Sequence, residues 1–159
     1  MGEVDYLLDI DGIKGESKDS KYPNAIHIDS WSFGTSRAPV TPQAGKSEGK
    51  VEATDLLFTK PADAASTGLL KAVAEGKPIA KAKLIARKAG TSQQEFLIIE
   101  LADVYVSSYQ VGGTGKGGDV PTDQFTLNYR KITMTYKEQQ DTGGLGGVLQ
   151  AIVDLGKAL

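Results

Sequence analysis

The glycine-rich stretch Gly113-Thr114-Gly115-Lys116-Gly117-Gly118 is the part of the sequence closest to a phosphate-binding loop. It fits the G-x-G-x-x-G pattern, in which backbone amides and the start of a helix bind a pyrophosphate. That pattern needs a helix after the loop, whereas Asp119-Val120-Pro121 and then a strand-like segment follow. Gly117 also stands where a phosphate loop needs Ser or Thr to bind Mg²⁺. We therefore interpret the stretch as a surface loop between two strands.

His27 and Asp29 are the next candidates, because a spacing of two places both side chains on one face of a strand. A metal site that begins this way needs at least one further imidazole or carboxylate. The chain has one His and no Cys, which excludes thiolate nucleophiles, disulfides and zinc ribbons and leaves little for a Ser–His–Asp triad. A surface ion pair is the simpler interpretation, and we expect no catalytic residues, no metal and no cofactor.

A basic strand edge is formed by Lys81, Lys83, Arg87 and Lys88. Nucleic-acid binding would require interleaved aromatic residues for base stacking, and none is present. With 18 basic and 20 acidic residues the net charge is −2, which gives no electrostatic case for binding nucleic acid or a membrane. We interpret these charges as a guard against strand-to-strand aggregation.

Targeting signals are not evident. The first residues have neither a basic start nor an apolar stretch of signal-peptide length. No window approaches the ~20 apolar residues of a membrane span. We therefore expect no membrane insertion, a cytoplasmic protein at first, and export without a cleaved signal peptide if it leaves the cell.

Most of the chain has the alternating pattern of β-strands, and 159 residues predict one domain with a full core. The apolar residues change face between Ile28 and Trp31, which predicts either a bulge or two buried faces. They change again near Arg130, which predicts a kink. The predicted strands are 4–10, 26–34, 51–59, 79–87, 95–101, 104–111 and 125–136.

One internal helix is predicted over about 66–75, with Ser66 as its N-cap and Gly76 at its end. Leu69, Leu70 and Val73 recur there at helical spacing. About seven strands around one helix predict a barrel or a two-sheet sandwich. The aromatic residues expected in the core are Trp31, Phe33, Phe58 and Phe125.

The tail is predicted to form an amphipathic helix over 145–159. At about 100° per residue, its apolar side chains fall within an arc of roughly 120°. Packing must stabilise so short a helix, so we expect it to dock on its own or a neighbouring subunit; a frayed end is the alternative. The residues of this arc are Leu145, Val148, Leu149, Ile152, Leu155 and Leu159.

Several short stretches carry a family resemblance through their order and spacing. They are Gly12-Ile13-Lys14-Gly15-Glu16-Ser17 with Asp19, Trp31-Ser32-Phe33-Gly34, Phe58-Thr59-Lys60 with Asp63, Arg87-Lys88-Ala89-Gly90, Val106-Ser107-Ser108, and Phe125-Thr126-Leu127 with Tyr136. Over roughly residues 3–141 the chain resembles the haemolysin-coregulated protein (Hcp) family, the tube proteins of bacterial type VI secretion.

Two departures from that family are visible. Ser66-Thr67-Gly68 stands where the family has Ser-Pro before a helix leucine. The usual ending, Trp-Asp followed by basic residues, is replaced by a Gly-spaced apolar tail. We therefore divide the chain into an Hcp-like β-barrel domain, 1–142, and a Gly-rich hinge with a C-terminal amphipathic tail, 143–159.

The resemblance implies a mainly β fold, a two-sheet barrel with one flanking helix, assembled into a hexameric ring. It further implies that rings stack into a tube within a contractile sheath on a baseplate, tipped by a spike protein. The tube would be expelled from the bacterial cytoplasm and would carry small effector proteins in its lumen. This is a structural and transport function without an enzymatic reaction.

Two regions are expected to make contacts in such an assembly. The long loop over 35–49 would contact a neighbouring subunit or ring, with Arg37, Val40, Lys46 and Glu48 as candidate residues. Ser32 alternates with Trp31 and Phe33, so it would face the channel if those two fill the core. An ordinary outward Ser is the alternative.

Two other classes of protein remain open. A monomeric β-barrel that binds a small ligand would have an interior lined with small residues and a clear loop at its mouth. An enzyme, most simply a hydrolase, would need a carboxylate pair.

Overall fold

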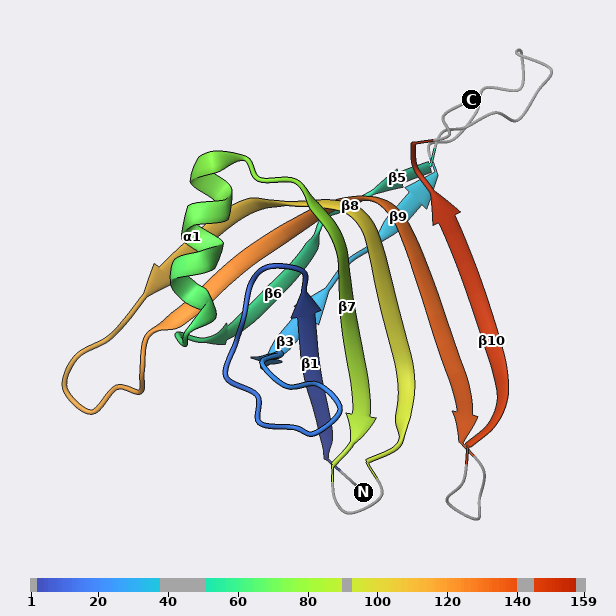
Figure 1. Ribbon diagram of the computed structural model, residues 1–159, viewed down its shortest axis with the longest axis horizontal. Helices are drawn as coiled ribbons and strands as arrows, with labels where there is room; N and C mark the ends of the chain where they lie inside the picture. The colour runs from blue at the N-terminus through green and yellow to red at the C-terminus, as the bar shows by residue number, and fades with distance from the viewer. Residues whose placement is uncertain (1–2, 38–50, 90–92, 140–144, 157–159) are drawn as a thin grey trace.

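The computed structural model describes residues 3–37, 51–89, 93–139 and 145–156. The predicted mainly β fold with one flanking helix is confirmed in these residues (Figure 1). The elements are β1 (Val4–Ile10), β2 (Ile26–Ile28), β3 (Ser30–Ser32), β4 (Thr35–Arg37), β5 (Val51–Ala53), β6 (Leu56–Pro61), α1 (Ala65–Glu75), β7 (Ile79–Lys88), β8 (Glu95–Gly112), β9 (Thr122–Gln139) and β10 (Leu145–Asp154).

The main sheet has eight strands in the order β2-β1-β7-β8-β9-β6-β3, with β10 added to β9. The expected closed barrel is wrong, because the hydrogen-bonded path ends at β2 and at β3. These two strands are consecutive and bend apart at Asp29: β2 pairs with β1, and β3 pairs with β6. No ladder joins β2 to β3 or β6 among the described residues. These ends of the sheet are linked by the covalent connection at Asp29 and by a hydrogen bond from Asp29 N–H to Thr59 O at 2.9 Å. The predicted irregularity between Ile28 and Trp31 is this bend.

The two long strands β8 and β9 form the spine of the sheet and change their buried face at the same level. On β8 the buried positions pass from Leu101 to Val104, and on β9 from Tyr129 to Ile132. Asp103 has a left-handed backbone, φ +54°, at that point. The predicted kink near Arg130 is confirmed, and the separately predicted strands 95–101 and 104–111 are one bent strand. The kink divides the sheet into two differently oriented halves.

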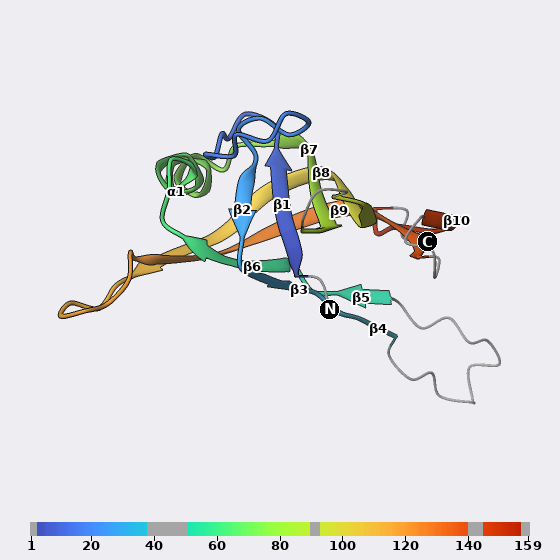
Figure 2. The same ribbon diagram turned by 90° about the horizontal axis from the view of Figure 1, so that it is seen from below.

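The core fills the inner side of the half made by β3, β6, β9 and β8. Phe58 and Phe125 are fully buried and stack with ring centroids 5.0 Å apart, as expected for core residues. Trp31 and Phe33 are half-buried and pack against the core edge. Figure 2 shows α1, β1 and β2 on this inner side, while the opposite side carries no covering element among the described residues.

The two ends of helix α1 are fixed by hydrogen bonds at its start and by a glycine at its end. Ser66 is not the N-cap; that position is Ala64, and the Asp63 carboxylate accepts the Ala65 N–H at 2.9 Å. Gly76 ends the helix in the left-handed conformation, φ +62°, as predicted. Ser66 lies inside the first turn, where its hydroxyl accepts the Asp63 N–H at 3.0 Å and donates to Asp123.

The predicted C-terminal helix is wrong, because Leu145–Asp154 forms the antiparallel strand β10. The second half of β9 presents an edge whose backbone groups need partners, and β10 supplies them. Gly146 and Gly147 disfavour a helix, and Val148, Ile152 and Val153 are β-branched and favour a strand. The tail therefore docks on its own subunit, as one alternative expected, but through backbone hydrogen bonds.

Substitution of Gly15 tests the packing of the 11–25 segment. A Cβ at Gly15 would lie 2.5 Å from Ala25 O and 2.8 Å from Ile26 Cα, both backbone atoms that cannot yield easily. We expect Gly15→Ala to lower the free energy of unfolding by about 1–3 kcal/mol, measured by urea denaturation. Gly34→Ala is the control, since no atom lies within 4 Å of its added Cβ. Equal stability of the two variants would contradict the close approach.

Candidate functional site

A buried ion pair joins β6 to β9. Lys60 and Asp123 are cross-strand partners, both side chains are 0% exposed, and Lys60 Nζ lies 2.8 Å from Asp123 Oδ2. Lys60 Nζ also donates to Asp63 Oδ1 at 2.6 Å and to Pro61 O at 3.2 Å. The pair thus ties the start of α1 to the centre of the sheet.

The Asp123 carboxylate is satisfied on both oxygens. Ser66 Oγ donates to Oδ2, and Tyr109 Oη donates to Oδ1 at 2.7 Å. Burial alone would raise the pKa of Asp123, but these donors and the charge of Lys60 outweigh it and hold the pKa below its ordinary value. Burial and the neighbouring carboxylate raise the pKa of Tyr109. A carboxylate held ionised by three donors is a structural anchor and a poor proton donor.

A second charged cluster fastens the 11–25 segment to β7 and β8. Arg87 Nη1 lies 2.9 Å from Asp19 Oδ1, and Tyr22 Oη donates to Glu95 Oε2 at 2.9 Å. Lys21 Nζ lies 2.7 Å from the same Glu95 oxygen. Burial and the hydrogen bond to Glu95 raise the pKa of Tyr22. The motif residues Asp19 and Arg87 therefore serve the fold, and they leave no free nucleophile or base in this cluster.

The motifs first examined for chemistry do not assemble a reactive site. His27 and Asp29 form no ion pair in the described part of the chain, because the strand bends at Asp29 and separates their faces. The Gly113–Gly118 stretch is an exposed loop followed by strand β9, as interpreted from the sequence. Among the described residues, no three His, Cys, Asp or Glu side chains gather as they would around a metal.

The bare outer face of β3, β6, β9 and β8 has an unusual chemistry: no outward position along these four strand segments is charged. Ser32 lies on this face, exposed and opposite Leu57 in the ladder. Acidic and basic residues make up 24% of the chain, so their absence from these thirteen positions is a selective feature of this face. The outward residues are Ser30, Ser32, Leu57, Thr59, Pro61, Tyr105, Ser107, Ser108, Gln110, Thr122, Gln124, Thr126 and Asn128. We call this set the neutral face.

Hydroxyl groups on the neutral face bond across its strands. Ser107 donates to Asp55 Oδ2 at 2.6 Å, and Asn128 donates to Asp55 Oδ1 at 2.9 Å. Thr126 lies 2.6 Å from both Ser107 and Ser108, oxygen to oxygen. The Asp55 carboxylate, which lies beside the face, is therefore occupied. The other half of the sheet, by contrast, turns charged residues such as Lys83 and Glu100 outward.

The four-stranded half ends in two unpaired strand edges. On one flank, β3 pairs only with β6 and ends the hydrogen-bonded path within the described chain. On the other, the β7 ladder stops at the Ile79–Val104 pair, so among the described strands residues 105–112 of β8 pair only with β9. Free edges of this kind are templates for a strand from another molecule.

The remaining predicted site residues are widely separated. Arg37 ends β4, whereas Val40, Lys46 and Glu48 lie outside the described residues. Val148, Leu149 and Ile152 lie exposed on β10, Leu145 begins that strand, and Leu155 follows it and packs against the core edge. Sequence reasoning missed the neutral face, although its signal was present as a lack of charge at alternate positions of four separate strands.

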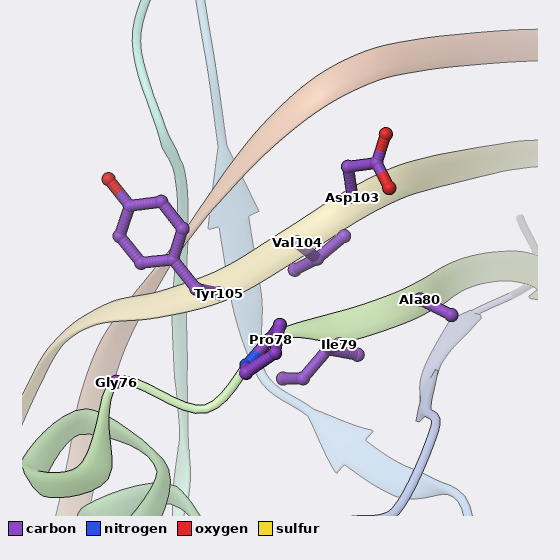
Figure 3. Close-up of a pocket in the computed structure, with 7 residues that line it drawn as sticks. All are labelled: Gly76, Pro78, Ile79, Ala80, Asp103, Val104 and Tyr105. Atoms are coloured by element: carbon purple, nitrogen blue, oxygen red, sulfur yellow. The ribbon is translucent and has the colours of Figure 1, made fainter.

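A shallow groove of about 490 Å³ lies where α1 turns into β7 (Figure 3). Pro78, just before β7, and Ile79, its first residue, lie beside Val104 and Tyr105 of β8, with Gly76 at the end of α1. Asp103 at its rim is ion-paired to Arg130, at 3.1 Å. The groove is mostly apolar, without a free charge or a nucleophile, so it offers packing and no catalytic group.

The sequence is similar to that of known proteins. Residues 7–136 match the family described as "Type VI secretion system effector, Hcp". The chain is 40% identical over 146 residues to protein hcp1 of Pseudomonas aeruginosa, covering 91% of this chain and 90% of that protein.

Solved structures agree. The fold is similar to that of a type six secretion system protein, with a TM-score of 0.87, 27% identity and 96% of both chains covered. It is also similar to Hcp1 from Salmonella typhimurium, with a TM-score of 0.78, 30% identity, and 98% and 96% of the two chains covered.

Removing the Asp123 carboxylate tests the buried ion pair. Asp123→Asn removes one of the two carboxylates that neutralise the buried Lys60 and leaves Asp63 as the other, so we expect a loss of about 3 kcal/mol in the free energy of unfolding at pH 7. Because the folded-state pKa of Asp123 is lowered, its stabilisation is complete above the ordinary pKa of 3.8 and is lost as the pH falls further. The free energy of unfolding of the variant should therefore fall less between pH 7 and pH 2 than that of the unsubstituted protein, as measured by urea denaturation. Asp119→Asn, at an exposed carboxylate outside the cluster, is the control, and equal behaviour of both variants would contradict the anchor.

Proposed function

The chain belongs to the Hcp family of type VI secretion tube proteins, and we propose that it forms a hexameric ring whose lumen is lined by the neutral face. The family is one of structural, secreted proteins and is not an enzyme family. The observation that carries this proposal is the bare, uncharged sheet face between two unpaired edges. The described residues form no helix long and apolar enough to cross a bilayer.

The neutral face suits the wall of a channel for proteins. A charged wall in a narrow lumen would attract or repel cargo strongly according to its charge, because such fields are focused in confined spaces. Hydroxyl and amide groups instead offer short-range hydrogen bonds, which water replaces readily. Ser32 is exposed on the edge strand of this face, and in the proposed ring it would contact such cargo.

The two free edges support closure into a ring. The β3 edge and the 105–112 edge of β8 lie on opposite flanks, so contact between them is head to tail. A repeated head-to-tail contact closes into a ring when its rotation allows, and it covers these two strand edges in every copy. In the proposed ring, the neutral faces of neighbouring subunits join into one continuous wall.

The wider assembly follows from the family. We propose that rings stack into a tube, and that the tube is expelled by a contractile sheath from a baseplate, with a spike protein at its tip. Small effector proteins would travel in the lumen, and the protein would be cytoplasmic before firing and exported without a cleaved signal. The loop with Arg37, Val40, Lys46 and Glu48 would contact a neighbouring subunit or ring.

The alternative, a monomeric barrel that binds a small ligand, has less support. The sheet is open, and the side chains of Phe58, Phe125 and Leu69 fill its interior with no exposed surface. The groove described above lies on the outside of the sheet.

Native mass spectrometry tests the ring directly. At micromolar concentration and moderate salt we expect the mass of a hexamer, because the strand edges of each copy are then covered. Dilution over a hundredfold range gives the concentration at which the ring dissociates. A spectrum containing only monomer under these conditions would contradict the proposal.

Substitution of Ser32 tests the lumen. Ser32→Arg places a long cation on the neutral face, so we expect the hexamer mass to persist while a co-produced small effector of the same bacterium co-purifies with the ring at least several-fold less. Ser20→Arg is the matched control, since Ser20 is an exposed Ser in the 11–25 segment on the opposite side of the sheet. Loss of the ring in the Ser32 variant alone would instead place Ser32 in a subunit interface.

A further inference from the structure

The C-terminal strand leaves an apolar edge exposed. The side chains of Val148, Leu149 and Ile152 are 61%, 58% and 56% exposed, and they point to both faces of β10. No residue from 145 to 153 is charged. Within the described residues β10 pairs with β9 alone, so its outer edge is free. A long, uncharged, apolar edge strand is a site at which another chain adds.

The groove at the α1–β7 turn provides an apolar surface on the opposite flank. Pro78 and Ala80 line it and are exposed, above a floor formed by the buried Ile79 and Val104, and the exposed Tyr105 marks the point at which the groove meets the neutral face. The one charged group at its rim, Asp103, is already paired with Arg130 of the same subunit. The groove therefore presents apolar surface and no unpaired charge, which matches the chemistry of β10.

Sheet topology relates the two surfaces. Strand β8 pairs along one side of β9, while β6 and β10 both pair along its other side. Strand β10 is therefore on the same flank as β3, and the groove adjoins the free 105–112 edge of β8. In a head-to-tail contact, β3 of one copy lies against the 105–112 edge of β8 of the next copy. The same contact brings β10 of the first copy close to the groove of the second.

We propose that β10 of each subunit packs against the groove at the α1–β7 turn of a second copy of this chain. The proposal rests on the head-to-tail ring proposed above. It adds a second contact between neighbouring subunits, which covers the free edge of β10. A second copy is the occupant because both surfaces are apolar, both lack free charge, and each copy has one of each on opposite flanks. One contact repeated around a closed ring covers every β10 edge and fills every groove.

Cross-linking between introduced cysteines tests this contact cleanly, because the chain has no Cys of its own. The variant carries Ala80→Cys in the groove and Ile152→Cys on β10. Within one subunit these positions lie three strands apart, at about 14 Å, which exceeds the ~7 Å limit between the Cα atoms of a disulfide. Oxidation, or treatment with a short bis-maleimide, should therefore give a ladder of bands up to the hexamer on a denaturing gel. Reductant should reverse the oxidised product.

The control carries Gln124→Cys on the neutral face with Ile152→Cys and should give no ladder. A hexamer mass for the Ala80–Ile152 variant without cross-links, or with no more than the control, would overturn this contact and leave the ring proposal standing. Cross-links in the Ile152→Cys single variant would overturn it in favour of β10 pairing with β10. Absence of a hexamer in the unsubstituted protein would instead overturn the ring itself.

The concentration dependence of the ring gives a second measurement. Ile152→Lys would place a charge against an apolar groove, so the concentration for half-dissociation should rise at least tenfold, as followed by native mass spectrometry. Ser20→Lys, with the same added charge elsewhere, should leave it unchanged. An unchanged value for Ile152→Lys would contradict the contact.

Discussion

The ion pair between Lys60 and Asp123 is the interaction on which the arrangement of the sheet depends. Two charges without any exposed surface are tolerable only when every oxygen and proton finds a partner. Here Ser66 on α1, Tyr109 on β8 and Asp63 in the turn before α1 supply those partners. The requirement to satisfy one buried carboxylate thus sets the distance between helix and sheet, and it holds β6, β9 and β8 in the register that creates the neutral face.

The kink of β8 and β9 gives the molecule two surfaces of different character. Before the kink on β9, outward residues are uncharged; beyond it, they include charged side chains such as Lys137. Arg130 stands at the boundary, and its guanidinium reaches Asp103 on β8 at 3.1 Å and Asp154 on β10 at 3.5 Å. A single side chain therefore links the three strands where the sheet changes direction, so the two surfaces keep a fixed relation.

Local pattern was sufficient for much of the fold. Alternation located the strands, Gly76 located the end of α1, and the parity change near Arg130 located the kink. Local pattern failed at Ser66, which was predicted as the N-cap but whose hydroxyl donates to Asp123, distant in sequence. It also failed at 145–154, where apolar residues at a 3.6-residue period predicted a helix and the structure has a strand. Both failures have one cause: the deciding partner, Asp123 or the β9 edge, is distant in sequence. The neutral face escaped notice for the same reason, since its residues come from four separate strands.

The pairing of β10 with β9 has a consequence for partly folded chains. Within the described residues, the stretch of β9 from Lys131 to Gln139 is covered on that side by β10 alone. Whenever β10 is undocked, the backbone groups along this stretch are unpaired, and an unpaired strand edge is a template for a strand of another molecule. Docking of β10 therefore closes an edge through which partly folded chains would otherwise aggregate.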